Sequence, residues 1–158
     1  MKIGVSGHRH RDGADWLWTR NAIADIFLQH PKAVGWSSLA VGADQVFAET
    51  ALVHGGGHVA VIPSYETYHT YFDGSDLDEY YRLLGRSKRV IKVSGKTDEV
   101  AFRKAGERVV RAADLMILVW DGEPARGEGG SGDIAAYAEK KRTKMILLNP
   151  ITRQGVYP

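Results

Sequence analysis

Six short runs of apolar, mostly β-branched residues recur along the chain, and most of them lack a strict alternation of apolar and polar residues. A strand with one face in water alternates, whereas a strand covered on both faces stays apolar throughout. The runs therefore predict strands of a sheet that is buried on both faces. They occupy residues 3–6, 33–39, 58–62, 89–93, 115–120 and 144–148.

Segments with apolar residues at helical spacing lie between these runs, as in Ala22, Ile23, Ile26 and Phe27. Alternation of strand and helix is typical of a parallel sheet, because right-handed crossovers place each connecting helix on a face of the sheet. A chain of 158 residues suits one such domain. We expect an α/β fold with a Rossmann-like parallel sheet of about six strands, helices on both faces, and a single nucleotide-binding domain over residues 1–158.

The least regular stretch, residues 63–86, is rich in tyrosine, and we expect a loop there with one short helix around residues 77–84. Tyr65, Tyr68, Tyr71 and Phe72 follow the third predicted strand. Their rings could stack on a nucleotide base or form a small apolar cluster under the loop, and both readings stay open.

Ligands of open α/β sheets bind beyond the carboxyl ends of the strands, so the loops after the strands are the first place to look for a site. The first strand runs into Gly7, His8 and Arg9. Glycine permits a tight turn with free N–H groups, and a guanidinium matches the geometry of phosphate. These residues predict a phosphate or ribose contact, although a plain turn with a solvated basic cluster over residues 8–11 explains them equally well.

The loop after the second strand contains Ser38, Gly42 and Asp44 just before a predicted helix. Small residues let the backbone approach a ligand closely, and a carboxylate at a helix start can bond a ribose hydroxyl. The same carboxylate can instead cap the free N–H groups of the helix. Ligand contact and capping are both compatible with the sequence.

After the fifth strand, Asp121 is followed by a polar loop and by a glycine-rich segment that opens the last predicted helix. Glycines at a helix start direct bare N–H groups and the positive end of the helix dipole toward an anion. The segment Gly129, Gly130, Ser131 and Gly132 is therefore the best phosphate cradle in the chain. Asp133 follows it at once and would repel a phosphate unless a cation intervenes, so it could simply cap the helix.

Composition narrows the range of functions. The 21 Lys and Arg residues against 19 Asp and Glu give a net charge of only +2, from which we expect no nonspecific grip on nucleic acid or membrane. The chain has no cysteine, and its six histidines show no ligand spacing, so we expect no metal. The strict dinucleotide fingerprint is missing, so we expect no cofactor. A cytoplasmic protein fits these features, and a homo-oligomer stays open.

The three loops together resemble the SLOG-type Rossmann-like superfamily, which groups the DNA-processing Smf proteins with the LOG phosphoribohydrolases. Residues 38–44 are similar to the S-G-x-A-x-G-x-D stretch of the DNA-processing branch, and residues 129–132 are similar to the P-G-G-x-G-T-x-x-E phosphate loop of the LOG branch. Glu128 stands where that loop has proline, Asp133 replaces threonine, and Ala136 falls where the catalytic glutamate would be. The resemblance implies nucleotide binding more firmly than hydrolysis.

A second, weaker resemblance links residues 113–122 and 132–138 to the nucleoside deoxyribosyltransferases, whose nucleophile is a carboxylate. The comparable glutamate is missing here too, and Asp121 or Asp133 would have to take its catalytic role at the anomeric carbon. We therefore expect a module that binds a nucleotide or nucleoside phosphate as a sensor or carrier. The alternative is an N-glycosidic bond hydrolase or transferase acting on nucleotides.

Overall fold

The computed structural model describes residues 1–124 and 130–158, and their strands form one seven-stranded sheet in the order β4-β3-β2-β1-β5-β6-β7. All neighbouring strands are parallel except β6 and β7, which are antiparallel. The strands are β1 (Lys2–Gly7), β2 (Val34–Ser37), β3 (His58–Pro63), β4 (Arg89–Val93), β5 (Leu115–Val119), β6 (Lys144–Asn149) and β7 (Gln154–Val156). The α/β, Rossmann-like prediction is confirmed.

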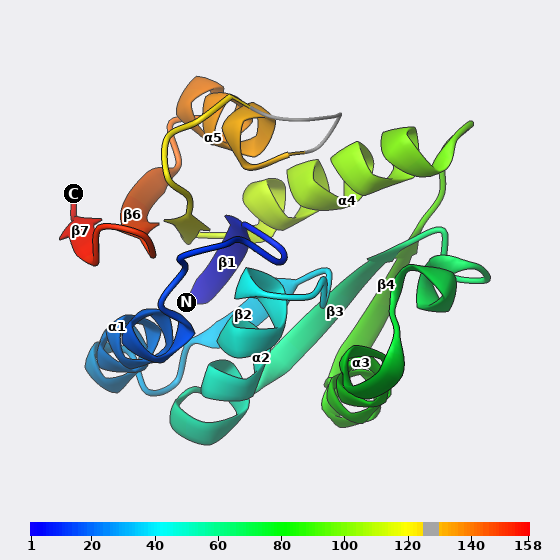
Figure 1. Ribbon diagram of the computed structural model, residues 1–158, viewed down its shortest axis with the longest axis horizontal. Helices are drawn as coiled ribbons and strands as arrows, with labels where there is room; N and C mark the ends of the chain where they lie inside the picture. Colours follow the sequence, from blue (N-terminus) through cyan, green and yellow to red (C-terminus); the bar gives the residue numbers. More distant parts are fainter. Residues whose placement is uncertain (125–129) are drawn as a thin grey trace.

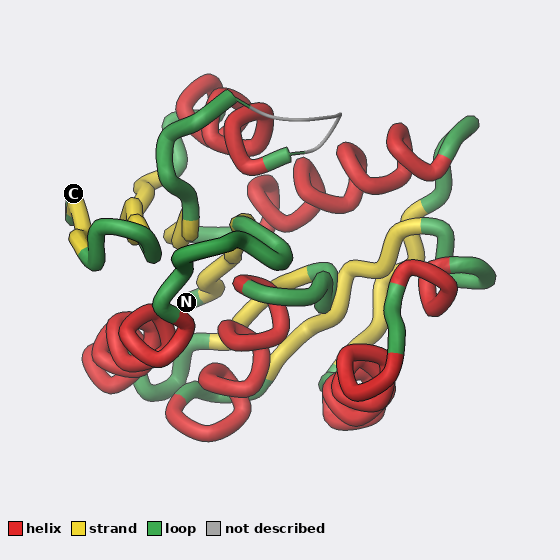
Figure 2. Tube along the Cα trace, viewed as in Figure 1, coloured by secondary structure: helices red, strands yellow, loops and turns green. Residues whose placement is uncertain are grey.

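The helices cover both faces of the sheet, with α1, α2 and α3 on one side and α4 and α5 on the other (Figure 1). They are α1 (Trp16–Gln29), α2 (Ala43–His54), α3 (Gly74–Arg86), α4 (Asp98–Ala112) and α5 (Ser131–Lys140), with a 3-10 turn η1 (Tyr68–Tyr71). Figure 2 shows the strands running between these two groups of helices. None of the helices in the described parts of the chain is long and apolar enough to cross a membrane.

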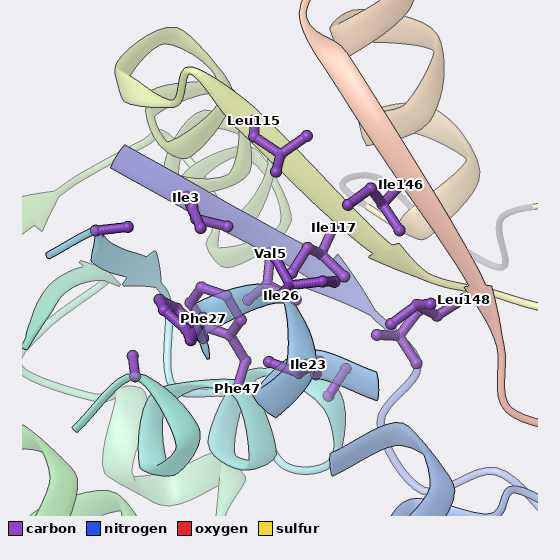
Figure 3. Packing of buried hydrophobic residues seen from close by; sticks show 14 residues of the cluster. Ile3, Val5, Ile23, Ile26, Phe27, Phe47, Leu115, Ile117, Ile146 and Leu148 are labelled. Carbon is purple, nitrogen blue, oxygen red and sulfur yellow. The ribbon is translucent and has the colours of Figure 1, made fainter. Parts of the chain in front are cut away.

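The core forms where the helices meet the central strands. All five residues of β5 are buried, as its unbroken apolar sequence predicts. Figure 3 shows the packing between β1, β5 and the α1–α2 pair, where the rings of Phe27 and Phe47 lie 5.4 Å apart between their centroids. Asp15 caps α1 by accepting a hydrogen bond from the backbone N–H of Trp18 at 2.9 Å.

The six predicted strands are all present, and one more was not predicted. The seventh strand, β7, is three residues long and fully exposed, so it carries none of the apolar pattern that identified the others. The prediction for residues 63–86 was partly right, because α3 is there but starts earlier than expected and is preceded by η1. The loop is well packed: Tyr68, Phe72 and Tyr80 are buried together against β3 and α2.

The direction of the chain positions a site between β1 and β5. The chain builds outward from β1 to β4, then returns through α4 to place β5 on the other side of β1. At such a reversal the loops that follow the two central strands separate in opposite directions and leave a crevice at the carboxyl edge of the sheet. The loops after β1 and β5 are two of those selected from the sequence.

Candidate functional site

Two small adjoining cavities open at the carboxyl edge of the sheet. The first, which we call the polar chamber, has a volume of about 80 Å³. It is lined by Val5, Ser6, Gly7, Arg9, Ser38, Ala40, Asp44, Pro63, Tyr68, Phe102, Gly106, Val109 and Ile134. Four of the predicted site residues, Gly7, Arg9, Ser38 and Asp44, therefore meet around one cavity.

The second cavity, the aromatic chamber, has a volume of about 170 Å³. Its lining is Arg9, His10, Ala40, Val41, Tyr68, Tyr71, Phe72, Asp73 and Asp76. The two chambers share Arg9, Ala40 and Tyr68, so these residues form the partition between them.

Asp44 is placed differently from a helix cap. Its Oδ2 accepts hydrogen bonds from the backbone N–H groups of Ser38 at 2.9 Å and Ala40 at 3.4 Å, which precede the helix. Asp44 thus holds the loop between β2 and α2, and no described residue bonds its second oxygen, Oδ1. Burial raises the pKa of Asp44 to about 6, although the two backbone N–H groups and Arg9 act in the opposite direction.

Tyr68 lines both chambers, and its side chain is only 1% exposed. Among residues 1–124 and 130–158, Trp36 Nε1 is the one enclosed side-chain polar atom without a hydrogen-bond partner, so the Tyr68 hydroxyl is not sealed off from solvent. Burial raises the pKa of Tyr68, the charge of Asp44 adds to that effect, and Arg9 opposes it. The hydroxyl therefore stays neutral and can donate a hydrogen bond.

Arg9 supplies the positive charge of the site. Its guanidinium lies 5.6 Å from the ring centre of Phe102 on α4 and forms no ion pair with any described residue. A guanidinium in this state is free to bind an anion. Arg9, Asp44 and Tyr68 thus bring a cation, a carboxyl group and an unpaired hydroxyl to one place.

Gly42 allows the loop after β2 to pack closely against the loop after β1. It adopts a φ of +87°, and a Cβ there would lie 2.5 Å from the carbonyl oxygen of His8 and 2.7 Å from that of Arg9. The same close approach lets the backbone N–H of Ala43 donate to the His8 carbonyl at 3.0 Å. Gly42 therefore positions Arg9 through the backbone.

His8 and Asp121 lie together in a second cluster that joins the loops after β1 and β5. Arg11 donates to Asp121 Oδ2 from Nε at 2.9 Å and from its terminal nitrogen at 2.6 Å. Nε2 of His8 accepts from the backbone N–H of Asp121 at 3.0 Å, and the Glu123 N–H donates to Asp121 Oδ1 at 3.0 Å. Burial would raise the pKa of Asp121, but the Glu123 N–H and the Arg11 guanidinium hold it below its usual range.

The glycine-rich segment is only partly described. Gly130 precedes α5, Ser131, Gly132 and Asp133 form its first turn, and the side chain of Asp133 is exposed. Ile134, one residue further on, lines the polar chamber. Gly129 lies outside the described residues, so the phosphate contact predicted for this segment stays a prediction.

Sequence reasoning missed the position of the Tyr68 hydroxyl, the contribution of Phe102 and the pairing of Arg11 with Asp121. Tyr68 was grouped with its aromatic neighbours, and the cluster interpretation is confirmed by ring centroids 5.1 Å apart for Tyr68 and Phe72. Its place in the lining of both chambers was not foreseen. Phe102 carried no signal beyond an apolar helix position, whereas Arg11 and Asp121 could have been paired because two opposite charges follow neighbouring central strands.

A larger groove of about 990 Å³ lies on the opposite side, at the amino ends of β5 and β6. We call it the basic groove, because Arg111, Lys141, Arg142 and Lys144 line it with a single carboxylate, Asp114. The exposed ring of Tyr157 is part of the same lining. Much positive charge is therefore concentrated on one side of a nearly neutral chain. The described residues contain no group of three or more His, Asp or Glu side chains that could hold a metal ion.

No protein-family model matches this sequence, and no curated protein does either. Solved structures do resemble it in fold. DNA processing protein A (DprA) from Helicobacter pylori superposes with a TM-score of 0.67 at 16% identity, over 94% of this chain and 65% of that one. The chain thus spans just under two thirds of that protein, which has a unique single-stranded DNA binding mode.

Two further structures share the fold. A molybdenum cofactor binding protein from Rippkaea orientalis has a TM-score of 0.61 at 19% identity, over 94% of this chain and 76% of that one. The structural genomics target TM1055 has a TM-score of 0.59 at 15% identity, over 94% of this chain and 74% of that one. The fold is thus shared by proteins with different ligands.

One expectation has to be corrected. The near-zero net charge was taken as evidence against nucleic acid as a partner, and this was wrong, because a DprA protein that binds single-stranded DNA has the same fold. Net charge is a sum over the whole chain and hides a local excess such as that of the basic groove.

The resemblance of the three loop motifs is confirmed at the level of the fold. DprA, TM1055 and the molybdenum cofactor binding protein all superpose on 94% of this chain. The chain therefore has the Rossmann-like α/β fold of these three proteins.

Proposed function

We propose that the chain binds a nucleotide or nucleoside-phosphate derivative at the carboxyl edge of its sheet, as a sensor or carrier module. The convergence of Arg9, Asp44 and Tyr68 on the polar chamber carries this proposal. Asp44 uses only Oδ2 in its bonds to the loop, and Tyr68 lines the same chamber, so a bound ligand can form hydrogen bonds with both side chains. Phosphate suits Arg9, and the hydroxyl groups of a ribose suit Asp44 and Tyr68.

The start of α5 extends this arrangement. The backbone N–H groups of Gly130, Ser131 and Gly132 are at the positive end of the helix dipole, and Ile134 of the same helix lines the polar chamber. We propose that one phosphate of the ligand lies between this helix start and Arg9, with the ribose toward Gly7, Ser38 and Asp44.

A thermal-shift screen tests the proposal. Wild-type protein is incubated with nucleoside mono-, di- and triphosphates, with their sugar derivatives and with ribose 5-phosphate, beside a Tyr68→Phe variant. At least one nucleotide should raise the melting temperature of the wild type, and the rise should be smaller in Tyr68→Phe. The absence of any shift across the panel would contradict nucleotide binding.

The contacts of Asp121 bear on the enzymatic alternative. Both of its oxygens are already bonded, and Ala136 provides no carboxyl group, so the catalytic role first considered for Asp121 and Asp133 is less well supported than binding without turnover. Asp44, with a pKa of about 6 and one unbonded oxygen, is a better candidate for an acid or base. Incubation with AMP should release no free base. Release that is abolished in Asp44→Asn would favour an N-glycosidase.

The basic groove supports a second candidate function, the binding of single-stranded nucleic acid. Four cations and the exposed ring of Tyr157 provide the charge and the stacking surface that such ligands need. The single-stranded DNA binding of the H. pylori protein with the same fold is consistent with it. This candidate uses the edge of the sheet opposite the two chambers.

Fluorescence anisotropy with labelled oligo-dT at several salt concentrations tests this candidate. Neutralisation of about four phosphates predicts a log–log salt slope near −3. Lys141→Glu should weaken binding, whereas Lys104→Glu, an equal charge reversal at an exposed position of α4, should have little effect. Equal losses in both variants would indicate nonspecific attraction and remove the groove from the proposal.

A further inference from the structure

The two chambers differ in size, so they can hold different parts of a ligand. A cavity of about 150 Å³ accommodates benzene. The aromatic chamber, at about 170 Å³, can therefore admit the six-membered ring of a base, whereas the polar chamber, at about 80 Å³, can take only a small group such as a phosphate or a ribose hydroxyl. Of the two chambers, only the aromatic one is large enough for the ring of a base.

The walls of the aromatic chamber suit a flat heteroaromatic ring. Tyr68, Tyr71 and Phe72 line it together with the guanidinium of Arg9. Tyr71 is held in place by its hydroxyl, which donates to Asp98 Oδ2 at 2.5 Å, and Asp98 in turn accepts from Ser64 at 2.9 Å. Aromatic faces and guanidinium groups both stack favourably on planar rings.

Two carboxylates complete the lining. Asp73 and Asp76 contribute acceptors only, and Asp76 Oδ2 also lies 3.2 Å from Nε2 of His10. Their negative charge repels a phosphate from this chamber and attracts N–H donors. A base with an exocyclic amino group matches such a lining, whereas a phosphate belongs beside Arg9.

We infer that the aromatic chamber is the base-specificity pocket of the nucleotide site and selects a base that carries an exocyclic amino group, with Asp76 as its acceptor. This inference rests on the proposed nucleotide binding and adds to it the orientation and class of the ligand. Arg9 then lies between the base in one chamber and the phosphate or ribose hydroxyl that reaches the other, since both chambers include it.

Isothermal titration with four ligands tests the inference: ribose 5-phosphate, which has no base; IMP, which lacks an exocyclic amine; and AMP and GMP, which carry one. AMP or GMP should bind at least about tenfold more tightly than IMP, because a hydrogen bond to a charged group is lost. Ribose 5-phosphate should bind more weakly than IMP.

Four variants locate the effect. Asp76→Asn should remove the tighter binding of AMP or GMP relative to IMP. Asp78→Asn, which changes an exposed carboxylate of the same helix, should preserve it. Tyr71→Ala should weaken the binding of the nucleotides but not that of ribose 5-phosphate. Tyr71→Phe keeps the ring and should bind the nucleotides as the wild type does. Because Tyr71 is 43% exposed, its truncation leaves the fold intact.

The outcomes separate this inference from the function on which it rests. If ribose 5-phosphate binds as tightly as AMP and GMP, and Tyr71→Ala has no effect, the base pocket is overturned while phosphate binding stands. If the wild type and Asp76→Asn both bind IMP, AMP and GMP with equal affinity, the selection for an exocyclic amine is overturned. If none of the four ligands binds, both the inference and the proposed nucleotide function fail.

Discussion

Replacing Asp44 with asparagine should stabilise the protein at neutral pH, although it removes a charged group from a helix start. Burial raises the pKa of Asp44 from its usual 3.8 to about 6, so the folded state holds the proton more tightly than the unfolded state. The stability gained from this proton is fully present below pH 3.8 and is lost as the pH rises through 6. At about 1.4 kcal/mol per pKa unit, the ionised carboxylate costs about 3 kcal/mol near neutral pH.

Asparagine avoids this cost and keeps the geometry. Its Oδ1 can accept from the N–H groups of Ser38 and Ala40 as Asp44 Oδ2 does. The free energy of unfolding of Asp44→Asn should exceed that of the wild type by about 3 kcal/mol at about pH 7.5, and by only about 1 kcal/mol at about pH 4.5. Urea denaturation of both proteins at the two pH values measures the difference, because the other titrating groups are common to both.

Asp78→Asn serves as the control, since Asp78 is an exposed carboxylate on α3. Its effect on the free energy of unfolding should be small and independent of pH. If Asp44→Asn is instead destabilising at about pH 7.5, or if its effect is the same at both pH values, the carboxylate is a favourable structural charge and the argument for a functional Asp44 is refuted.

Three further substitutions test the framework of the site. Gly42→Ala should lower the free energy of unfolding by at least about 2 kcal/mol, because Gly42 has a positive φ and two carbonyl groups lie close to it. Gly74→Ala should lower it clearly less, because Gly74 has a φ of +49° but nothing within 4 Å of an added Cβ. Equal losses in urea denaturation would contradict the steric argument. Asp121→Ala should cost about 2 kcal/mol, because it leaves Arg11 unpaired in a part-buried cluster, whereas Glu79→Ala on the surface should cost less than about 1 kcal/mol in the same assay. Tyr68→Phe should change the unfolding free energy by less than about 0.5 kcal/mol, because its hydroxyl has no described partner; a loss of 2 kcal/mol or more would mean that the hydroxyl is bonded within the fold.

Most of the fold could be predicted from the sequence, because each buried strand carries its own local signal. The unbroken apolar run of β5 identifies a strand covered on both faces, and the spacing of Ile23, Ile26 and Phe27 identifies the buried side of α1. β7 could not be predicted, because it is short, exposed and held only by its antiparallel pairing with β6.

The site was predicted in part, for a physical reason. The rule that ligands bind beyond the carboxyl ends of parallel strands selected Gly7, Arg9, Ser38 and Asp44, which the fold brings to one chamber. The rule does not say which side chains pair with one another. Arg11 and Asp121 are 110 positions apart, and only the pairing of β1 with β5 brings them together.

Tyr68 illustrates the other limit of the sequence. A tyrosine among aromatic neighbours has the same pattern whether its hydroxyl reaches water, a partner or an empty chamber. Only the packing of η1 against β3 and α3 shows that the ring is buried and that the hydroxyl lies at a cavity. Asp44 is similar, since its bonds to Ser38 and Ala40 depend on the conformation of the loop rather than on its position at a helix start.

A crystal structure of the protein with a bound nucleoside monophosphate would show whether the two chambers form the nucleotide site. We expect the phosphate within hydrogen-bond distance of the Arg9 guanidinium, a ribose hydroxyl on Tyr68 or Asp44, and the base in the chamber lined by Tyr71 and Phe72. A nucleotide that binds instead in the groove lined by Arg111 and Lys141, with both chambers unchanged, would contradict this expectation.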